Sequence, residues 1–112
     1  MEITEEKRGE VIVIGLRGRL DAVTSPSAEK RLLALISQAN TRIVLDLSGL
    51  SYISSLGLRV LLTVAKQVRA GSGRLALAAL NGTVLDILKL AGFTELFSVF
   101  QTPDEAAAYC AG

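Results

Sequence analysis

The chain has 112 residues, half of them apolar, with 12 basic and 11 acidic side chains. This length and apolar content fit one domain with a sizeable core, and the near-zero net charge gives no field for attracting nucleic acid or an anionic membrane. The charged N-terminus lacks a signal-peptide core, no apolar run approaches membrane-spanning length and the one cysteine, Cys110, cannot form an internal disulfide, so we expect a cytoplasmic protein.

The N-terminal segment predicts an antiparallel hairpin followed by a helix. Met1–Glu6 alternates apolar and polar residues, and Glu10–Leu16 is rich in valine and isoleucine. We expect a helix that begins at Pro26, with Ser25 as its cap, and ends near Asn40. Proline suits the first helical position because the amide proton that it lacks has no partner there, and serine is a preferred cap.

The middle of the chain predicts a buried strand, a serine-bearing loop and a second helix. Arg42–Leu47 is apolar and β-prone, and Ser48-Gly49 breaks it. The next helix is expected to begin close to Ser54 or Ser55 and to stop at Ala70, since helical spacing relates the apolar residues Leu58, Leu61, Leu62, Ala65 and Val68.

The C-terminal part repeats the alternation of strand and helix. Arg74–Ala79 is an apolar strand, a helix follows Asn81, and Gly92 is a left-handed helix stop. Leu96–Phe100 is a short strand candidate, and a capping box opens a last helix over Thr102–Tyr109. We therefore expect an α/β domain with about four helices and a mixed, mostly parallel sheet of four to five strands, including the N-terminal antiparallel hairpin.

The loops that follow the carboxyl ends of parallel strands gather on one edge of a sheet, which is the usual functional surface. Here that edge should collect Asp21–Ser25 and Ser48–Ser55. A serine at the start of the second helix can accept hydrogen bonds from the unpaired first-turn amides, as a cap. The same place also favours a phosphate. The residues alone leave both roles open for Ser55, and capping is the simpler one.

Four segments together resemble the STAS domain, in particular the bacterial anti-sigma factor antagonists, over essentially all of residues 1–112. They are Gly18-Arg19-Leu20-Asp21 with Thr24, Val44–Leu50, Tyr52–Leu58 and Ala91-Gly92-Phe93. With Gly57 and Leu58 as anchors, the resemblance implies that Ser55 is the phosphoacceptor. Ser54 then replaces the aspartate usual in the family and is a secondary candidate, and Leu56 replaces the second hydroxyl.

The resemblance also implies the partners. The unphosphorylated protein would bind an anti-sigma factor that is a serine kinase of the histidine-kinase-like ATPase type, and so free the sigma factor. The kinase would release the protein by phosphorylating it, and a metal-dependent serine phosphatase would restore it. The partner surface would comprise Asp21, Thr24, Ser54, Ser55, Leu56, Gly57 and Arg59. The alternative is a STAS subunit of a lipid-transport or stress-signalling complex.

An enzyme is not expected. The chain has no histidine and no Gly-x-Ser-x-Gly elbow, so a serine triad lacks its usual base, and one cysteine without histidine makes zinc improbable. The glycine pattern supports no cofactor site. Asp21 and Asp46 could face a nucleotide or a metal. The favoured interpretation is that Asp21 caps the first helix and that loop amides orient Asp46.

Overall fold

Strands and helices alternate along the computed structural model, which describes residues 1–37 and 41–112. The strands are β1 (Glu2–Arg8), β2 (Val11–Leu20), β3 (Arg42–Asp46), β4 (Leu50–Ile53), β5 (Arg74–Ala78) and β6 (Ser98–Phe100). The helices are α1 (Ser25–Ser37), α2 (Ser55–Ala70), α3 (Gly82–Leu90) and α4 (Pro103–Ala111), with a 3₁₀ turn, η1 (Phe93–Glu95). The predicted end of the first helix, near Asn40, lies outside the described residues.

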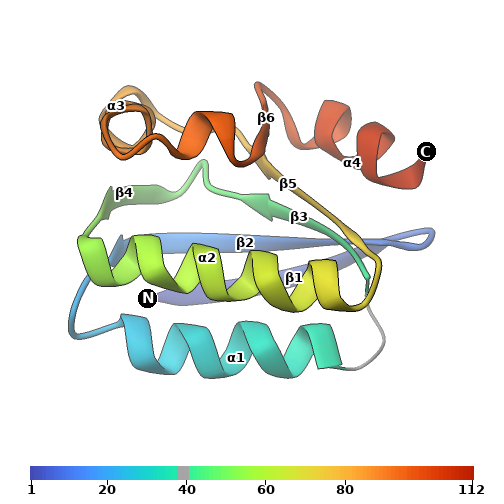
Figure 1. Ribbon diagram of the computed structural model, residues 1–112, viewed down its shortest axis with the longest axis horizontal. Helices are drawn as coiled ribbons and strands as arrows, with labels where there is room; N and C mark the ends of the chain where they lie inside the picture. Colours follow the sequence, from blue (N-terminus) through green and yellow to red (C-terminus); the bar gives the residue numbers. More distant parts are fainter. Residues whose placement is uncertain (38–40) are drawn as a thin grey trace.

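The sheet is mixed, as predicted, and its order is β1-β2-β3-β5-β6, with β4 also paired to β2 (Figure 1). β1 and β2 form the expected antiparallel hairpin, and the other pairings are parallel. The turn falls at Gly9, whose φ of 64° is a left-handed conformation that glycine adopts without steric cost. Both hairpin strands are longer than the sequence predicts, because the end of β1 pairs with the start of β2, whereas the end of β2, Gly18–Leu20, pairs with β4.

β2 has two parallel partners along its length, and this arrangement was not predicted. Residues Ile12–Gly15 pair with β3, whereas Gly18–Leu20 pair with β4 after a register shift between Gly18 and Arg19. Gly18 has a φ of 111°, which only glycine adopts readily. β4 therefore extends the sheet beyond the predicted four to five strands and carries the serine loop to the carboxyl end of β2.

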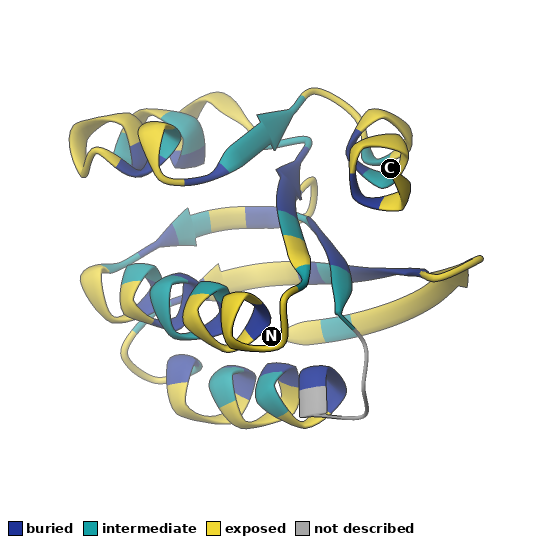
Figure 2. Cartoon of the chain, turned by 45° about the vertical axis from the view of Figure 1, so that its right-hand side comes forward, coloured by how far each residue is buried: buried dark blue, intermediate teal, exposed yellow. Residues whose placement is uncertain are grey.

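Helices cover the two faces of the sheet unequally. α1, α2 and α3 share the larger core with one set of strand side chains, whose members include Ile14, Leu45 and Leu77. On the other face, α4 contributes Ala106 and Cys110 to a smaller cluster. α1 and α2 lie side by side (Figure 1), and the buried positions of the helices face the sheet (Figure 2). Within residues 1–37 and 41–112, no helix combines the length and apolar character that crossing a bilayer requires.

The helix ends agree with local sequence signals in most places. Asn81 caps α3, Gly92 has a φ of 77°, and the Thr102 hydroxyl accepts from the Glu105 amide at 3.2 Å in the predicted capping box. The prediction that Ser25 caps α1 is wrong. Ser25 is the first helical residue, only 4% exposed, and its hydroxyl has no hydrogen-bond partner in the described part of the chain. The preceding Thr24 supplies the carbonyl that accepts from the Ala28 amide.

Candidate functional site

The structure brings the two predicted loop segments together at the carboxyl ends of β2 and β4. The Gly18 amide donates to the Gly49 carbonyl, and the Ser54 amide donates to the Leu20 carbonyl, both at 2.9 Å. The Ser51 hydroxyl also donates to the Gly18 carbonyl at 3.0 Å. These bonds place the start of α2 directly beside the loop that follows β2, so the predicted gathering of Asp21–Ser25 and Ser48–Ser55 is confirmed.

Ser54, and not Ser55, caps α2. Ser54 has extended backbone angles, and its hydroxyl accepts from the Gly57 amide at 3.2 Å. Its carbonyl accepts from the Leu58 amide at 2.9 Å. The structure thus confirms the predicted start of the helix but contradicts the alternative in which Ser55 serves only as a cap.

Ser55 is the first residue of α2, and its side chain is exposed. Its hydroxyl makes no hydrogen bond within the described residues, and the amides of Ser55 and Leu56 have no acceptor there. Such free donors are expected in the first turn of a helix. A negative group attached at Ser55 would therefore lie beside unpaired donors and the positive end of the helix dipole.

Gly57 lets the backbone of the β2 end approach the first turn of α2. A Cβ built at this position would lie 2.6 Å from the Leu20 carbonyl oxygen and 2.7 Å from Cγ1 of Ile53. Real Cβ atoms do not come so close to a backbone oxygen. This confirms the expectation that Gly57 is small because another backbone must pass, and it gives Gly57 a positioning role in the site.

Asp21 and Thr24 tie the loop before α1 into a fixed shape. One Asp21 carboxylate oxygen accepts from the amides of Val23 at 3.0 Å and Thr24 at 3.1 Å. The Thr24 hydroxyl accepts from the Asp21 amide at 3.0 Å and donates to the Arg19 carbonyl at 2.7 Å. The bond from the Thr24 amide is the main reason why the pKa of Asp21 lies below its ordinary value. Asp21 therefore has a structural role, as expected, but its carboxylate fixes the loop before α1 and does not accept from an amide of the helix itself, so the predicted helix cap is not observed.

Arg19 lies beside this loop and is already engaged. Its guanidinium lies over the ring of Tyr52, 4.5 Å from the centroid, and its Nε is 3.7 Å from the Asp21 carboxylate. Asp46 behaves as the sequence indicated, because one of its carboxylate oxygens accepts from the Ser48 amide at 3.0 Å. In the described ranges 1–37 and 41–112, no group of acidic residues and cysteine is arranged to hold a metal ion.

The site also presents two exposed apolar side chains, Val23 at 85% and Leu56 at 40% exposure. Val23 lies two residues after Asp21, and Leu56 directly follows Ser55. Leu56 belongs to the partner surface that the sequence predicts, whereas Val23 does not. The available signal was a β-branched apolar residue inside a short polar loop that its flanking residues fix in place. Arg59, four residues after Ser55, is exposed on the same helix.

Comparison with known proteins identifies the family. The family model of the STAS domain matches residues 2–106. BtrV of Bordetella bronchiseptica, named as a candidate anti-sigma factor antagonist, is 37% identical over 108 residues, which cover 96% of this chain and 93% of BtrV.

Two solved structures have the same fold. The anti-sigma factor antagonist SpoIIAA, in its unphosphorylated form, is 26% identical, with a TM-score of 0.84 and coverage of 99% of this chain and 97% of SpoIIAA. An anti-sigma factor antagonist from Mycobacterium paratuberculosis is 23% identical, with a TM-score of 0.91 and coverage of 99% and 94%. With a family model matched over nearly its whole length, the chain belongs to the STAS domain family.

Proposed function

We propose that this protein is a cytoplasmic anti-sigma factor antagonist whose binding is switched off by phosphorylation of Ser55. In its unmodified form it binds an anti-sigma factor that is also a serine kinase of the histidine-kinase-like ATPase type, and the sigma factor is released. The kinase then transfers the γ-phosphoryl group of ATP to the Ser55 hydroxyl, whose proton leaves, and ADP is the other product. A metal-dependent serine phosphatase reverses the modification. The protein itself acts by binding and not by turnover.

The observation that carries the proposal is that Ser54 caps α2, whereas Ser55 is exposed and is not needed for the cap. Ser54 satisfies the Gly57 amide at 3.2 Å, so the cap does not depend on Ser55. The exposed Ser55 hydroxyl is thus free to react while the start of α2 stays intact. The names of BtrV and SpoIIAA support the partner class that we propose.

The same geometry explains how a small modification could abolish binding. A phosphoserine carries nearly two negative charges, and at this position they would lie in the first turn of α2, next to Leu56 and across from the loop that holds Val23. A partner surface that is complementary to these exposed apolar side chains would have to bury the charged phosphate when it binds. A ten-thousandfold loss of affinity requires only about 5.5 kcal/mol, which unfavourable desolvation and like-charge contact can supply.

The alternative, a subunit of a lipid-transport or stress-signalling complex, has less support. It shares the fold, but the relatives described above carry the names of anti-sigma factor antagonists. It predicts stable assembly with a transporter ATPase or a large signalling complex, independent of the state of Ser55.

The test uses the purified protein and the anti-sigma factor kinase of the same organism. Binding is measured by calorimetry for the wild type, Ser55→Ala and Ser55→Asp, and the modified residue is mapped by mass spectrometry after incubation with ATP. Ser72→Asp is the matched control, because it adds the same charge in the exposed turn at the other end of α2. We expect Ser55→Ala to bind and to resist release by ATP, Ser55→Asp to lose binding, and Ser72→Asp to bind normally.

Two results would overturn the proposal. One is equal binding by Ser55→Ala and Ser55→Asp, which would mean that charge at this position is not read by the partner. The other is phosphorylation confined to residues other than Ser55.

A further inference from the structure

We infer that Arg59 is a built-in counter-charge for a phosphoryl group on Ser55, which it holds on the solvent-facing side of α2. This inference rests on the proposed phosphorylation of Ser55. It gives Arg59 a regulatory role, which is to fix the position of the phosphate group that a partner protein contacts.

Helical geometry brings the two side chains together. Ser55 and Arg59 both lie within α2 and are both exposed. Residues four apart are neighbours on a helix surface, and an acidic group that precedes a basic one by four residues is in the more favourable order. The guanidinium can also make two parallel hydrogen bonds to phosphate oxygens, which a single ammonium group cannot do.

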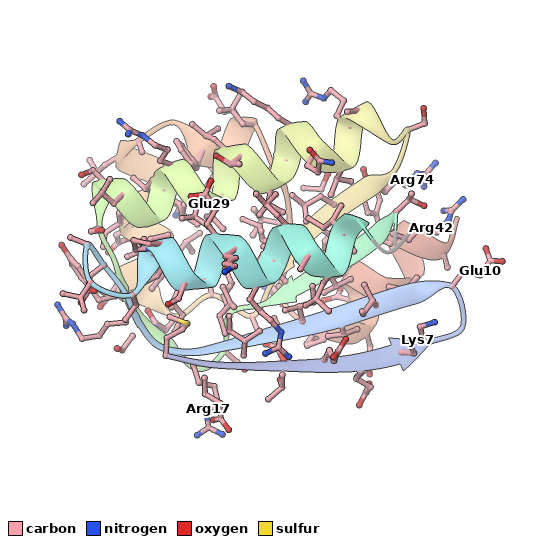
Figure 3. The ribbon with its side chains drawn as sticks, turned by 90° about the horizontal axis from the view of Figure 1, so that it is seen from below. Lys7, Glu10, Arg17, Glu29, Arg42 and Arg74 are labelled. Carbon is pink, nitrogen blue, oxygen red and sulfur yellow. The ribbon has the colours of Figure 1, made fainter. Side chains whose placement is uncertain are left out.

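Arg59 is free to take this role. Within residues 1–37 and 41–112, its guanidinium has no carboxylate within ion-pair distance, whereas Arg8 has two and Arg17, Arg19 and Arg31 have one each. The titratable group that α1 presents toward α2 is Glu29, which lies between the two helices in Figure 3 and forms no ion pair with Arg59. An arginine left unpaired one turn from the proposed acceptor is available as soon as the phosphate appears.

Five other cations of the described chain are poorly placed to compete. Arg19 is held by the ring of Tyr52 and by Asp21. Lys7, Arg42 and Arg74 lie at the end of the sheet opposite to the start of α2 (Figure 3). Lys66 is exposed on α2, but eleven residues of helix separate it from Ser55 by about 16 Å, which exceeds the screening length of about 10 Å at 0.1 M salt.

The experiment measures the ionisation of the phosphate directly by ³¹P NMR. Phosphoserine is installed at position 55 by genetic encoding, so the measurement does not depend on any kinase. The chemical shift is then titrated for the otherwise wild-type protein and for Arg59→Gln, Arg59→Lys and Lys66→Gln. Lys66→Gln removes the same charge from the same helix and is the matched control. A change that is only structural would not move the phosphate ionisation.

We expect the second pKa of the phosphate, near 6 for free phosphoserine, to rise by about 0.3 unit in Arg59→Gln, because the pair that favours the dianion is lost. In Arg59→Lys, the second pKa of the phosphate should return most of the way to the wild-type value, because a positive charge is again present. In Lys66→Gln, the phosphate should titrate like that of the wild type. Coinciding curves for the wild type and Arg59→Gln would overturn the inference. An equal shift in Lys66→Gln would do the same, since it would indicate a general field. If kinases never modify Ser55, the proposed function fails whatever the NMR titration gives, so the two failures are distinguishable.

Discussion

Replacing Gly57 by alanine should destabilise the protein, although alanine is the better helix former. The intrinsic gain from Gly→Ala inside a helix is about 1 kcal/mol. Against it stands the new Cβ, which would lie 2.6 Å from the Leu20 carbonyl oxygen and 2.7 Å from Ile53 Cγ1. Overpacking of this kind costs about 1–3 kcal/mol. The displaced Leu20 carbonyl also accepts from the Ser54 amide at 2.9 Å, a bond that contributes about 1 kcal/mol.

These terms leave a net loss of about 1–3 kcal/mol in the free energy of unfolding. For 112 residues, each kcal/mol corresponds to about 4 °C in the melting temperature. Urea denaturation followed by circular dichroism measures the loss. Gly82→Ala is the control, because it lies at the start of α3, where an added Cβ has nothing within 4 Å, and it should be neutral or stabilising. Gly57→Ala at or above wild-type stability would refute the close-approach argument.

Three further measurements examine the site. Ser54→Ala should lower the free energy of unfolding by about 1 kcal/mol through loss of the cap, whereas Ser55→Ala should stay within about 0.5 kcal/mol of the wild type; the reverse order in urea titrations would assign the cap to Ser55. Ser25→Ala should be neutral or stabilising by up to about 1 kcal/mol, since it deletes a buried hydroxyl without a partner, and a clear loss would show that a partner exists. In ¹³C NMR, the pKa of the Asp21 carboxyl should lie below its ordinary value of 3.8, because hydrogen bonds stabilise its charged form in the folded state. Its contribution to stability is then present above pH 3.8 and is lost as the pH falls through the lower, folded-state pKa. A titration midpoint at or above 3.8 would contradict the hydrogen-bonded loop.

Signals that lie within a few residues of one another were sufficient to predict most of the fold. The capping box at Thr102 and the left-handed stop at Gly92 are local in this sense, and both are present. β4 could not be found in the same way, because its four residues become a strand only by pairing with β2, more than thirty residues earlier in the chain. Ser25 failed for a related reason, since the Asp21–Thr24 loop fixes the start of α1 one residue earlier.

The candidate site was predictable at the level of segments and less so at the level of single atoms. The sequence located the start of α2 at Ser54 or Ser55, but only the geometry assigns the cap to Ser54. The sequence predicted that Gly57 is small because another backbone passes close to it, but only the structure identifies that backbone as the end of β2 at Leu20. Val23 was missed because the polar loop around it is only a weak signal, and the 85% exposure of its side chain depends on the loop conformation that Asp21 and Thr24 fix.

The bond from the Ser54 amide to the Leu20 carbonyl has a mechanical consequence for signalling. It attaches Ser54, the residue before Ser55, to the end of β2, and the cap bond holds Gly57, two residues after Ser55. These two bonds hold the backbone on both sides of Ser55, so a phosphate added there would leave the fold in place. A partner would then detect the phosphate through the changed charge of the surface, and not through a changed conformation. The switch that we propose would therefore need no second conformation of the fold, and hydrolysis of the phosphate ester would restore the starting state.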